Sequence, residues 1–288
     1  MDCRYHFLEP IIRDFSRRPV AAASSRTAMF AGLFVLLLAI IPTISHATES
    51  GVQELLSQGE AFEQKRETKQ AIKVYLAAEK LSPTNSEVLI KLAKQYSDLI
   101  FETPTEAEQK KLAGRCLDYA RRAVECGPTN ARAHLSVAIG LAKNFPYLDN
   151  QTKVNYSREL KERAEKAIAL DPRQDLAYHM LGRWHFEVAD MNRFLKLLMK
   201  AIYGGLPTGT YELAAANFKK AVEIAPGRVI HRVELARTLL KSGDRKSAME
   251  QLKSSLAFKP ADKDDADAQT TARKMLEAMG VKPDGSPK

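Results

Sequence analysis

One spacing pattern recurs along most of this chain and constrains its fold more than any other feature. A small residue is followed by a large one, then by a small, aromatic or aliphatic, small set and a closing proline. Small residues let two helices approach closely, and proline ends the second helix. The spacing predicts helix–turn–helix units of roughly 34 residues. The first and last copies are Gly59, Phe62, Ala71, Tyr75, Ala78 and Pro83, and Ala236, Leu239, Ala248, Leu252, Ser255 and Pro260.

Three further copies lie between these two. Their closing prolines are Pro128, Pro172 and Pro226, each preceded five residues earlier by an alanine. The pattern resembles the tetratricopeptide repeat, which implies an all-α, right-handed helical solenoid of about five helix pairs. A last segment, from about Asp262 to Met279, is predicted to be a C-terminal capping helix.

Insertions separate the first and second helices of the middle three units. They are about 11, 10 and 20 residues long, and the first two approximate three helical turns. We therefore expect lengthened central helices whose buried face is not rotated. The sequence from Thr103 to Glu106 is predicted to start one of them as a capping box with proline in the first turn.

The N-terminal segment predicts a secretory signal peptide over residues 1–47, cleaved after Ala47. Four arginines, from Arg13 to Arg26, precede the 13-residue apolar run Met29–Ile41, and signals typically have about 7–15 such residues. The alternative is an uncleaved membrane anchor through residues 28–42, because roughly 20 residues span a bilayer. The expected organisation is a tetratricopeptide-like helical domain at 48–280 and a disordered tail at 281–288. Cleavage would make the protein periplasmic or secreted.

Charge and cysteines exclude some classes of function. The net charge is +9; residues 1–47 hold five basic and three acidic residues, which leaves +9 − 2 = +7 for the remainder. Basic residues are interspersed with acids and aromatics are few, which argues against nucleic-acid binding. Cys116 and Cys126, predicted on one helix about 15 Å apart, cannot form a disulfide. They are expected to be buried thiols.

The irregular segments of the chain are more specific than the repeats. They are Leu181-Gly182-Arg183-Trp184, Ala189-Asp190-Met191, Lys200 to Glu212, Asn217 to Ala221 with Pro226-Gly227, and Pro260 to Asp265. These segments resemble the regulator of microtubule dynamics family, and the similarity extends over roughly Val52 to Met279. That resemblance implies a non-enzymatic protein associated with microtubules, spindle poles or mitochondria, with one branch that binds and transfers lipid. A secretory signal departs from this pattern, because it would place the chain away from microtubules.

In such a solenoid the first helices line the concave face. The residues at the repeat positions expected to face it form an apolar groove with a row of basic side chains. Such a groove suits an acidic amphipathic helix or a phospholipid. The alternative is that its apolar members contact the lengthened helices. The groove candidates are Ile90, Lys94, Arg132, Leu135, Ile139, Leu176, His179, Arg183, Phe186, Ile230, Val233, Arg237 and Leu240.

A second candidate surface is an amphipathic helix within the longest insertion. Its apolar residues fall in a narrow arc opposite Arg193, Lys196 and Lys200, which is typical of helices that lie on membranes or partner proteins. The alternative is packing against the lengthened helices. The apolar residues are Met191, Phe194, Leu195, Leu198 and Ile202.

Catalytic and metal motifs are not found. His179 and His185 are six residues apart and face different sides of a helix, and there is no Gly-rich phosphate loop. We expect no enzyme activity, no metal and no cofactor. The predicted function is a scaffold that binds a protein partner, of unknown identity, in its concave groove. The alternative is a lipid-binding or lipid-transfer module, which a deep, continuous apolar cavity would favour over a groove of mixed polarity.

Overall fold

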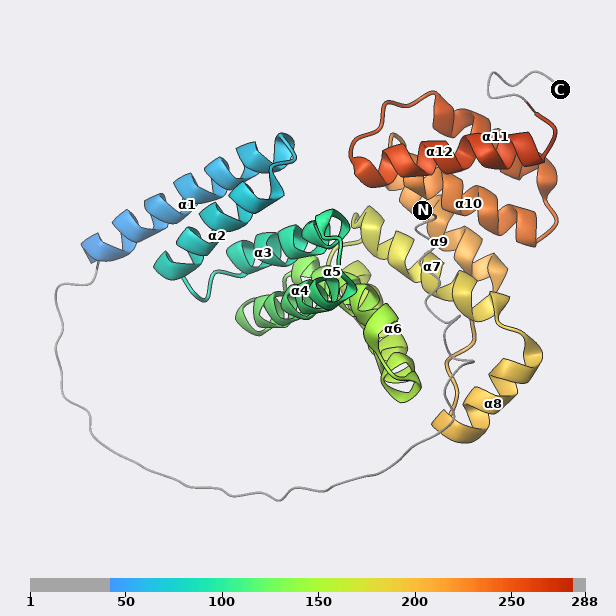
Figure 1. The fold of residues 1–288 in the computed structure, drawn as a ribbon, viewed down its shortest axis with the longest axis horizontal. Coiled ribbons are helices and arrows are strands. Elements are labelled where there is room, and N and C mark those ends of the chain that lie inside the picture. Colours follow the sequence, from blue (N-terminus) through green and yellow to red (C-terminus); the bar gives the residue numbers. More distant parts are fainter. Residues whose placement is uncertain (1–41, 282–288) are drawn as a thin grey trace.

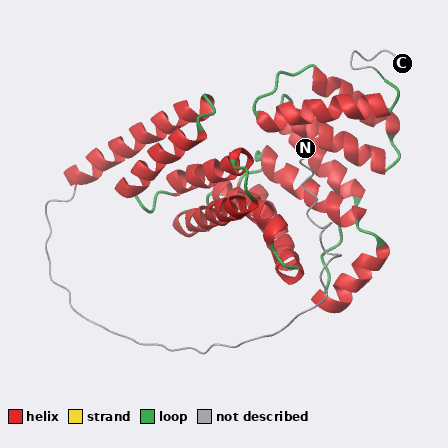
Figure 2. Ribbon diagram, viewed as in Figure 1, coloured by secondary structure: helices red, strands yellow, loops and turns green. Residues whose placement is uncertain are grey.

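The computed structural model describes residues 42–281, and these form twelve α-helices and two short 3-10 helices (Figures 1 and 2). Ten of the α-helices form five antiparallel pairs, which confirms the predicted all-α repeat architecture. The pairs are α1 (Pro42–Gln64) with α2 (Thr68–Leu81), α3 (Ser86–Leu99) with α4 (Glu106–Cys126), α5 (Ala131–Asn144) with α6 (Asn150–Leu170), α7 (Asp175–Asp190) with α9 (Tyr211–Ile224), and α10 (Val229–Lys241) with α11 (Arg245–Leu256).

Successive pairs stack into one array. The first helices α3, α5, α7 and α10 each contact the first helix of a neighbouring unit, as in a helical solenoid. The capping helix α12 (Lys263–Ala278) packs on both α10 and α11. The core therefore runs along the array as a series of clusters between pairs.

The turns between units are fixed by short local signals. In the Pro-Thr-Asn turns after α2 and α4, an asparagine side chain accepts hydrogen bonds from the next helix. Asn85 Oδ1 accepts from Glu87 N and Val88 N, at 3.0 and 3.2 Å, and Asn130 Oδ1 accepts from Arg132 N at 3.0 Å. These N-caps satisfy amide groups that the first turn of a helix leaves unpaired.

The insertions behave in two ways. The first two lengthen the second helices as predicted, because α4 and α6 each have 21 residues whereas α2 has 14. The third forms a separate helix, α8 (Arg193–Tyr203), and a loop that leads into α9. The predicted capping box is wrong by two residues: Thr105 is the N-cap of α4, and Thr103 Oγ1 donates instead to Leu99 O at the end of α3.

The two cysteines differ. Cys116 is buried, and burial raises the pKa of its thiol to about 12, so it is inert at neutral pH. Cys126 is exposed, contrary to the prediction, because it is the last residue of α4. Both are free thiols.

Glycine is required where a first helix faces an aromatic ring of the second helix. A Cβ on Gly59 would lie 2.2 Å from Tyr75 Cε1, and one on Gly182 would lie 2.9 Å from Phe218 Cε1. Both rings are fully buried. In these units the missing side chain of the glycine on one helix makes room for the aromatic ring on the other.

We expect Gly59→Ala to lower the free energy of unfolding by about 1–3 kcal/mol, because overpacking outweighs the gain in helix propensity. Gly114→Ala, in the middle of α4, is the matched control, since nothing lies within 4 Å of its Cβ. That change is expected to stabilise the protein by about 0.5–1 kcal/mol. Urea unfolding measures the stability of both variants. Equal changes of the same sign would contradict the close approach of Gly59 to Tyr75.

Candidate binding surface

Ion pairs between successive units follow the first helices. On α3, Lys91 Nζ lies 2.8 Å from Glu60 Oε1 of α1, and Lys94 Nζ lies 3.2 Å from Glu63 Oε2. Lys94 also pairs with Asp98 at 2.9 Å. The first junction of the array therefore carries alternating charges that are already paired.

The same arrangement recurs further along. Arg132 of α5 donates to both oxygens of Glu87 of α3, at 2.8 and 2.9 Å. Just before α10, Arg228 pairs with Asp262 at 2.8 Å. Within the described residues, this first-helix face (the exposed and half-exposed side chains of α3, α5, α7 and α10) is thus of mixed polarity.

A buried charge cluster joins α7 to α10. Arg183 Nη1 lies 3.4 Å from Glu234 Oε1, and Arg183 Nη2 lies 3.5 Å from Glu187 Oε1. Arg237 Nη1 also reaches Glu234, at 3.2 Å. Burial raises the pKa of Glu187 to about 7, although Arg183 acts against this. The cluster holds two carboxylates away from water, which makes Arg183, the buried arginine between them, structural.

The Glu187 carboxyl predicts a pH dependence. Its pKa in the folded protein is raised from 4.5 to about 7, so the folded state binds more protons than the unfolded state between these values. Its contribution therefore lowers stability as pH rises through this range, by up to about 3 kcal/mol. We expect Glu187→Gln to flatten the stability profile relative to the wild type, and the exposed Glu125→Gln to leave it unchanged. Urea unfolding at several pH values is the measurement, and parallel profiles for wild type and Glu187→Gln would contradict the shift.

A second buried network, which the sequence did not reveal, lies beside this cluster. His231 Nε2 donates to Asp175 Oδ2 at 2.9 Å, and Nδ1 of His231 lies 3.0 Å from Nδ1 of His179. Burial and the neighbouring His231 and Arg183 lower the pKa of His179 well below its ordinary value, so that ring is neutral. The network ties α7 to α10, and both histidines are buried whereas the Asp175 side chain is 26% exposed.

The structure divides the predicted groove residues into three groups. Two are exposed, Lys94 and Arg132; five are partly buried, Ile139, Leu176, Ile230, Arg237 and Leu240. Six are buried and do not line an exposed groove: Ile90, Leu135, His179, Arg183, Phe186 and Val233. The reason is that the first helices contact one another. Residues at the repeat positions predicted to face the groove therefore lie in contacts between units.

The predicted amphipathic helix is present as α8, but it presents its apolar residues on two sides. Met199, which was not predicted as a contact, is buried in the core cluster. Met191 and Leu195 pack partly against this cluster, and Leu198 is partly buried. Phe194 and Ile202 are exposed, 76% and 46%, together with Leu197 at 59%.

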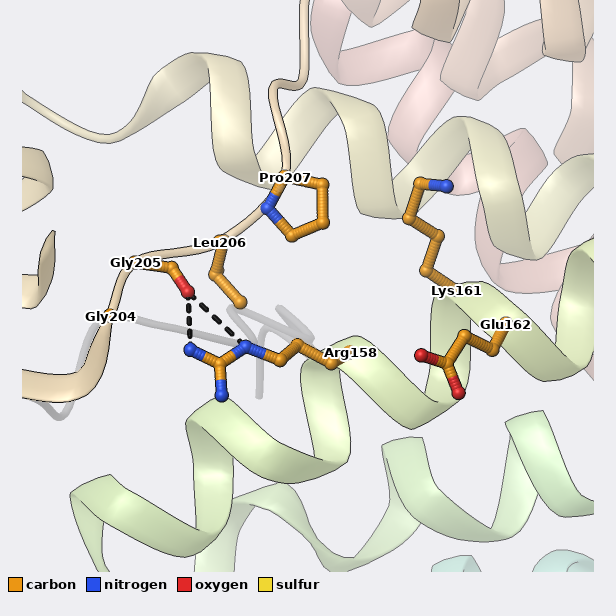
Figure 3. A pocket seen from close by; sticks show the side chains of 7 residues that line it. All are labelled: Arg158, Lys161, Glu162, Gly204, Gly205, Leu206 and Pro207. Carbon is orange, nitrogen blue, oxygen red and sulfur yellow. Dashed lines mark hydrogen bonds between the residues drawn. The ribbon is translucent and has the colours of Figure 1, made fainter.

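A pocket of about 410 Å³ lies where the α8–α9 loop crosses α6 (Figure 3). It is lined by Arg158, Lys161 and Glu162 and by the loop residues Gly204 to Pro207. Arg158 points to the loop and donates through Nη2 and Nε to Gly205 O, at 2.6 and 3.2 Å. The guanidinium thus binds carbonyl groups at the C-terminal end of α8, where a cation is favourable.

Within residues 42–281, no group of three or more His, Cys, Asp and Glu side chains could hold a metal ion. None of the helices described is both long and apolar enough to cross a membrane. The predicted anchor, residues 28–42, lies outside the described part of the chain except for Pro42, as does most of the predicted signal.

Solved structures share the fold. A thermophilic tetratricopeptide-repeat protein from Thermus thermophilus has a TM-score of 0.58 and 18% identity, covering 78% of this chain and 99% of its own. Pseudomonas aeruginosa PilF has a TM-score of 0.52 and 14% identity, covering 81% of this chain and 93% of its own. At these identities the likeness concerns architecture alone.

Sequence relatives are more specific. Regulator of microtubule dynamics protein 1 of Mus musculus is 29% identical over 238 residues, which is 82% of this chain and 77% of that protein. Regulator of microtubule dynamics protein 3 of Xenopus laevis is 30% identical over 195 residues, 67% of this chain and 42% of that protein. The family model described as Regulator of microtubule dynamics protein 1-3 matches residues 55–280. The chain therefore belongs to the regulator of microtubule dynamics family, whose tetratricopeptide-like domain is a helical scaffold.

Proposed function

We propose that this protein is a non-catalytic scaffold that binds a protein partner across the first-helix face. The observation that carries the proposal is the mixed polarity of that face. At two successive junctions an exposed cation pairs with a less exposed acid of the preceding unit: Lys94 with Glu63 and Arg132 with Glu87. An acidic group of a partner can compete for these two cations with little loss, since a pair with an exposed member is worth only about 0–1 kcal/mol.

A lipid in the groove is the alternative, and the geometry favours it less. All four predicted cations lie within 4 Å of carboxylates of the same chain. Six of the predicted lining residues are buried against neighbouring units. At Arg183 an anionic headgroup would have to displace two desolvated internal pairs.

Tubulin is the first partner to test, because the relatives are named for microtubule dynamics. The full chain is mixed with polymerised microtubules and sedimented, alongside Arg132→Glu on the first-helix face and Lys166→Glu on α6. Both residues are exposed. Co-sedimentation that is weakened by Arg132→Glu and kept by Lys166→Glu supports a tubulin site on this face. Binding that both variants retain places tubulin elsewhere on the molecule.

We also propose that the protein is exported, and this proposal conflicts with binding to tubulin. We infer cleavage after Ala47, which would leave Thr48 as the mature N-terminus and keep the buried Val52 and Leu56 of α1. The mass of the intact protein recovered from its native host decides this, with Ala47→Arg as the variant expected to block processing. A mature chain that retains residues 1–47 would contradict cleavage.

A further inference from the structure

Helix α8 carries a surface that is separate from the first-helix face. At 3.6 residues per turn, Leu195, Met199 and Tyr203 share one side of α8, and Met199 is buried in the core cluster. Phe194, Leu197, Leu198 and Ala201 follow the i, i+3, i+4, i+7 spacing of a different side. This second side, with Ile202 at its edge, is the outer face of α8.

The outer face of α8 is open to solvent. Phe194 is 76% exposed and Leu197 59%. Apart from isolated contacts, α8 packs along no other helix within residues 42–281, and it lies at the periphery of the array (Figure 1). Within residues 42–281, five large apolar side chains are exposed, and three of them, Phe194, Leu197 and Ile202, belong to this helix.

The helix is nevertheless held in place. Asn192 caps its N-terminus by accepting from Leu195 N at 2.8 Å. Gly204 ends it in the left-handed conformation, with φ of 73°, and Arg158 binds the carbonyl of Gly205. The apolar outer face is therefore presented by a preformed element, so docking does not require α8 to fold.

Charge indicates what covers the outer face. The sequence of α8 contains Arg193, Lys196 and Lys200 and no acidic residue. The nearest preceding acid, Asp190, pairs with Lys241 at 2.6 Å. Arg193 and Lys200 flank the apolar stripe on one side, which matches a surface that is apolar inside and negatively charged outside.

We propose that the outer face of α8 docks onto an anionic phospholipid bilayer. Phe194, Leu197 and Leu198 enter the interfacial region, and Arg193 and Lys200 lie among the headgroups. A convex helix with apolar side chains and flanking cations suits a planar lipid surface, which offers no specific hydrogen-bond partners. The array then stands on the membrane through α8, and its first-helix face is a separate surface.

The test uses the full chain with a polarity-sensitive fluorophore on Leu197→Cys, in a Cys3→Ser, Cys126→Ser background. A probe on Lys166→Cys of α6 is the matched control. Vesicles are phosphatidylcholine with or without phosphatidylserine. We expect a blue shift at position 197 with phosphatidylserine vesicles and none at position 166. Because both chains carry residues 1–41, the difference between the two probes reports α8 itself.

Two variants measure the separate contributions of the cations and of the apolar side chains to vesicle binding. Arg193→Gln with Lys200→Gln is expected to weaken vesicle binding at α8 about thirtyfold, since each cation near an anionic surface contributes about fivefold. Phe194→Ser is expected to weaken it at least about tenfold, and its exposed position leaves folding intact.

Five results would overturn the proposal. The first four are no shift at position 197, an equal shift at both positions, an equal shift with pure phosphatidylcholine, and a shift that grows with protein concentration without vesicles. The fourth would assign the outer face to a second copy of the chain. A shift at 197 that is present without vesicles and lost on deleting residues 29–41 would assign it to that apolar segment and also overturn the proposal.

Discussion

Replacing Phe218 by alanine is expected to lower the free energy of unfolding by about 3–5 kcal/mol. Phe218 is fully buried between α7 and α9, its ring opposite Gly182 and 5.4 Å from the ring of His179. Removing it empties the space that the glycine leaves for it. Because Gly182 has no side chain that could fill the cavity, α7 and α9 can close it only by moving their backbones.

Phe194→Ala is the matched control, since Phe194 is 76% exposed on α8. It should change the stability by less than about 0.5 kcal/mol. Urea unfolding followed by circular dichroism measures both variants, with the slope checked for loss of cooperativity between units. Equal losses for the two phenylalanines would contradict the assignment of Phe218 to the core and of Phe194 to the surface.

The second large effect is expected at Arg183. Arg183→Met leaves Glu187 and Glu234 buried with less positive charge, and removing one partner of a buried pair costs about 3–5 kcal/mol. The loss should be smaller at acidic pH, because protonation of Glu187, whose pKa is already raised to about 7, removes one of the uncompensated charges.

Arg132→Met is the control for this variant. Arg132 makes a closer ion pair, to Glu87 at 2.8 Å, but its side chain is 48% exposed. Its loss should cost no more than about 1 kcal/mol. If the two arginine variants were equally stable, desolvation would not be what makes the α7–α10 cluster important.

The repeat spacing predicts the fold well because the signals are local. Closing prolines, capping asparagines and the glycine opposite Tyr75 act within one unit or at the turn that leads to the next, and each unit contacts only its neighbours. The first two insertions, each about three helical turns long, also act locally, because each lengthens one helix, α4 or α6. The third insertion could be predicted as a helix but not placed, because nothing local fixes how α8 attaches.

The candidate surface was harder to predict, since it depends on how units rotate against each other. His179 and Arg183 occupy groove offsets in the repeat, yet the contact of α7 with α10 buries them beside Asp175, Glu187 and Glu234. The acids that pair with Lys94 and Arg132 come from other units, so spacing within one unit cannot reveal them. On α8, hydrophobicity alone does not distinguish the buried Met199 from the exposed Phe194.

Site-specific photo-crosslinking shows whether a protein partner lies on the first-helix face. A photoreactive amino acid replaces Arg132 on this face or, as the control, the exposed Lys166 on α6, in the full chain expressed in its native host. We predict a discrete protein adduct at position 132 that is missing at position 166. A lipid adduct at position 132, or the same adducts at both positions, would contradict it.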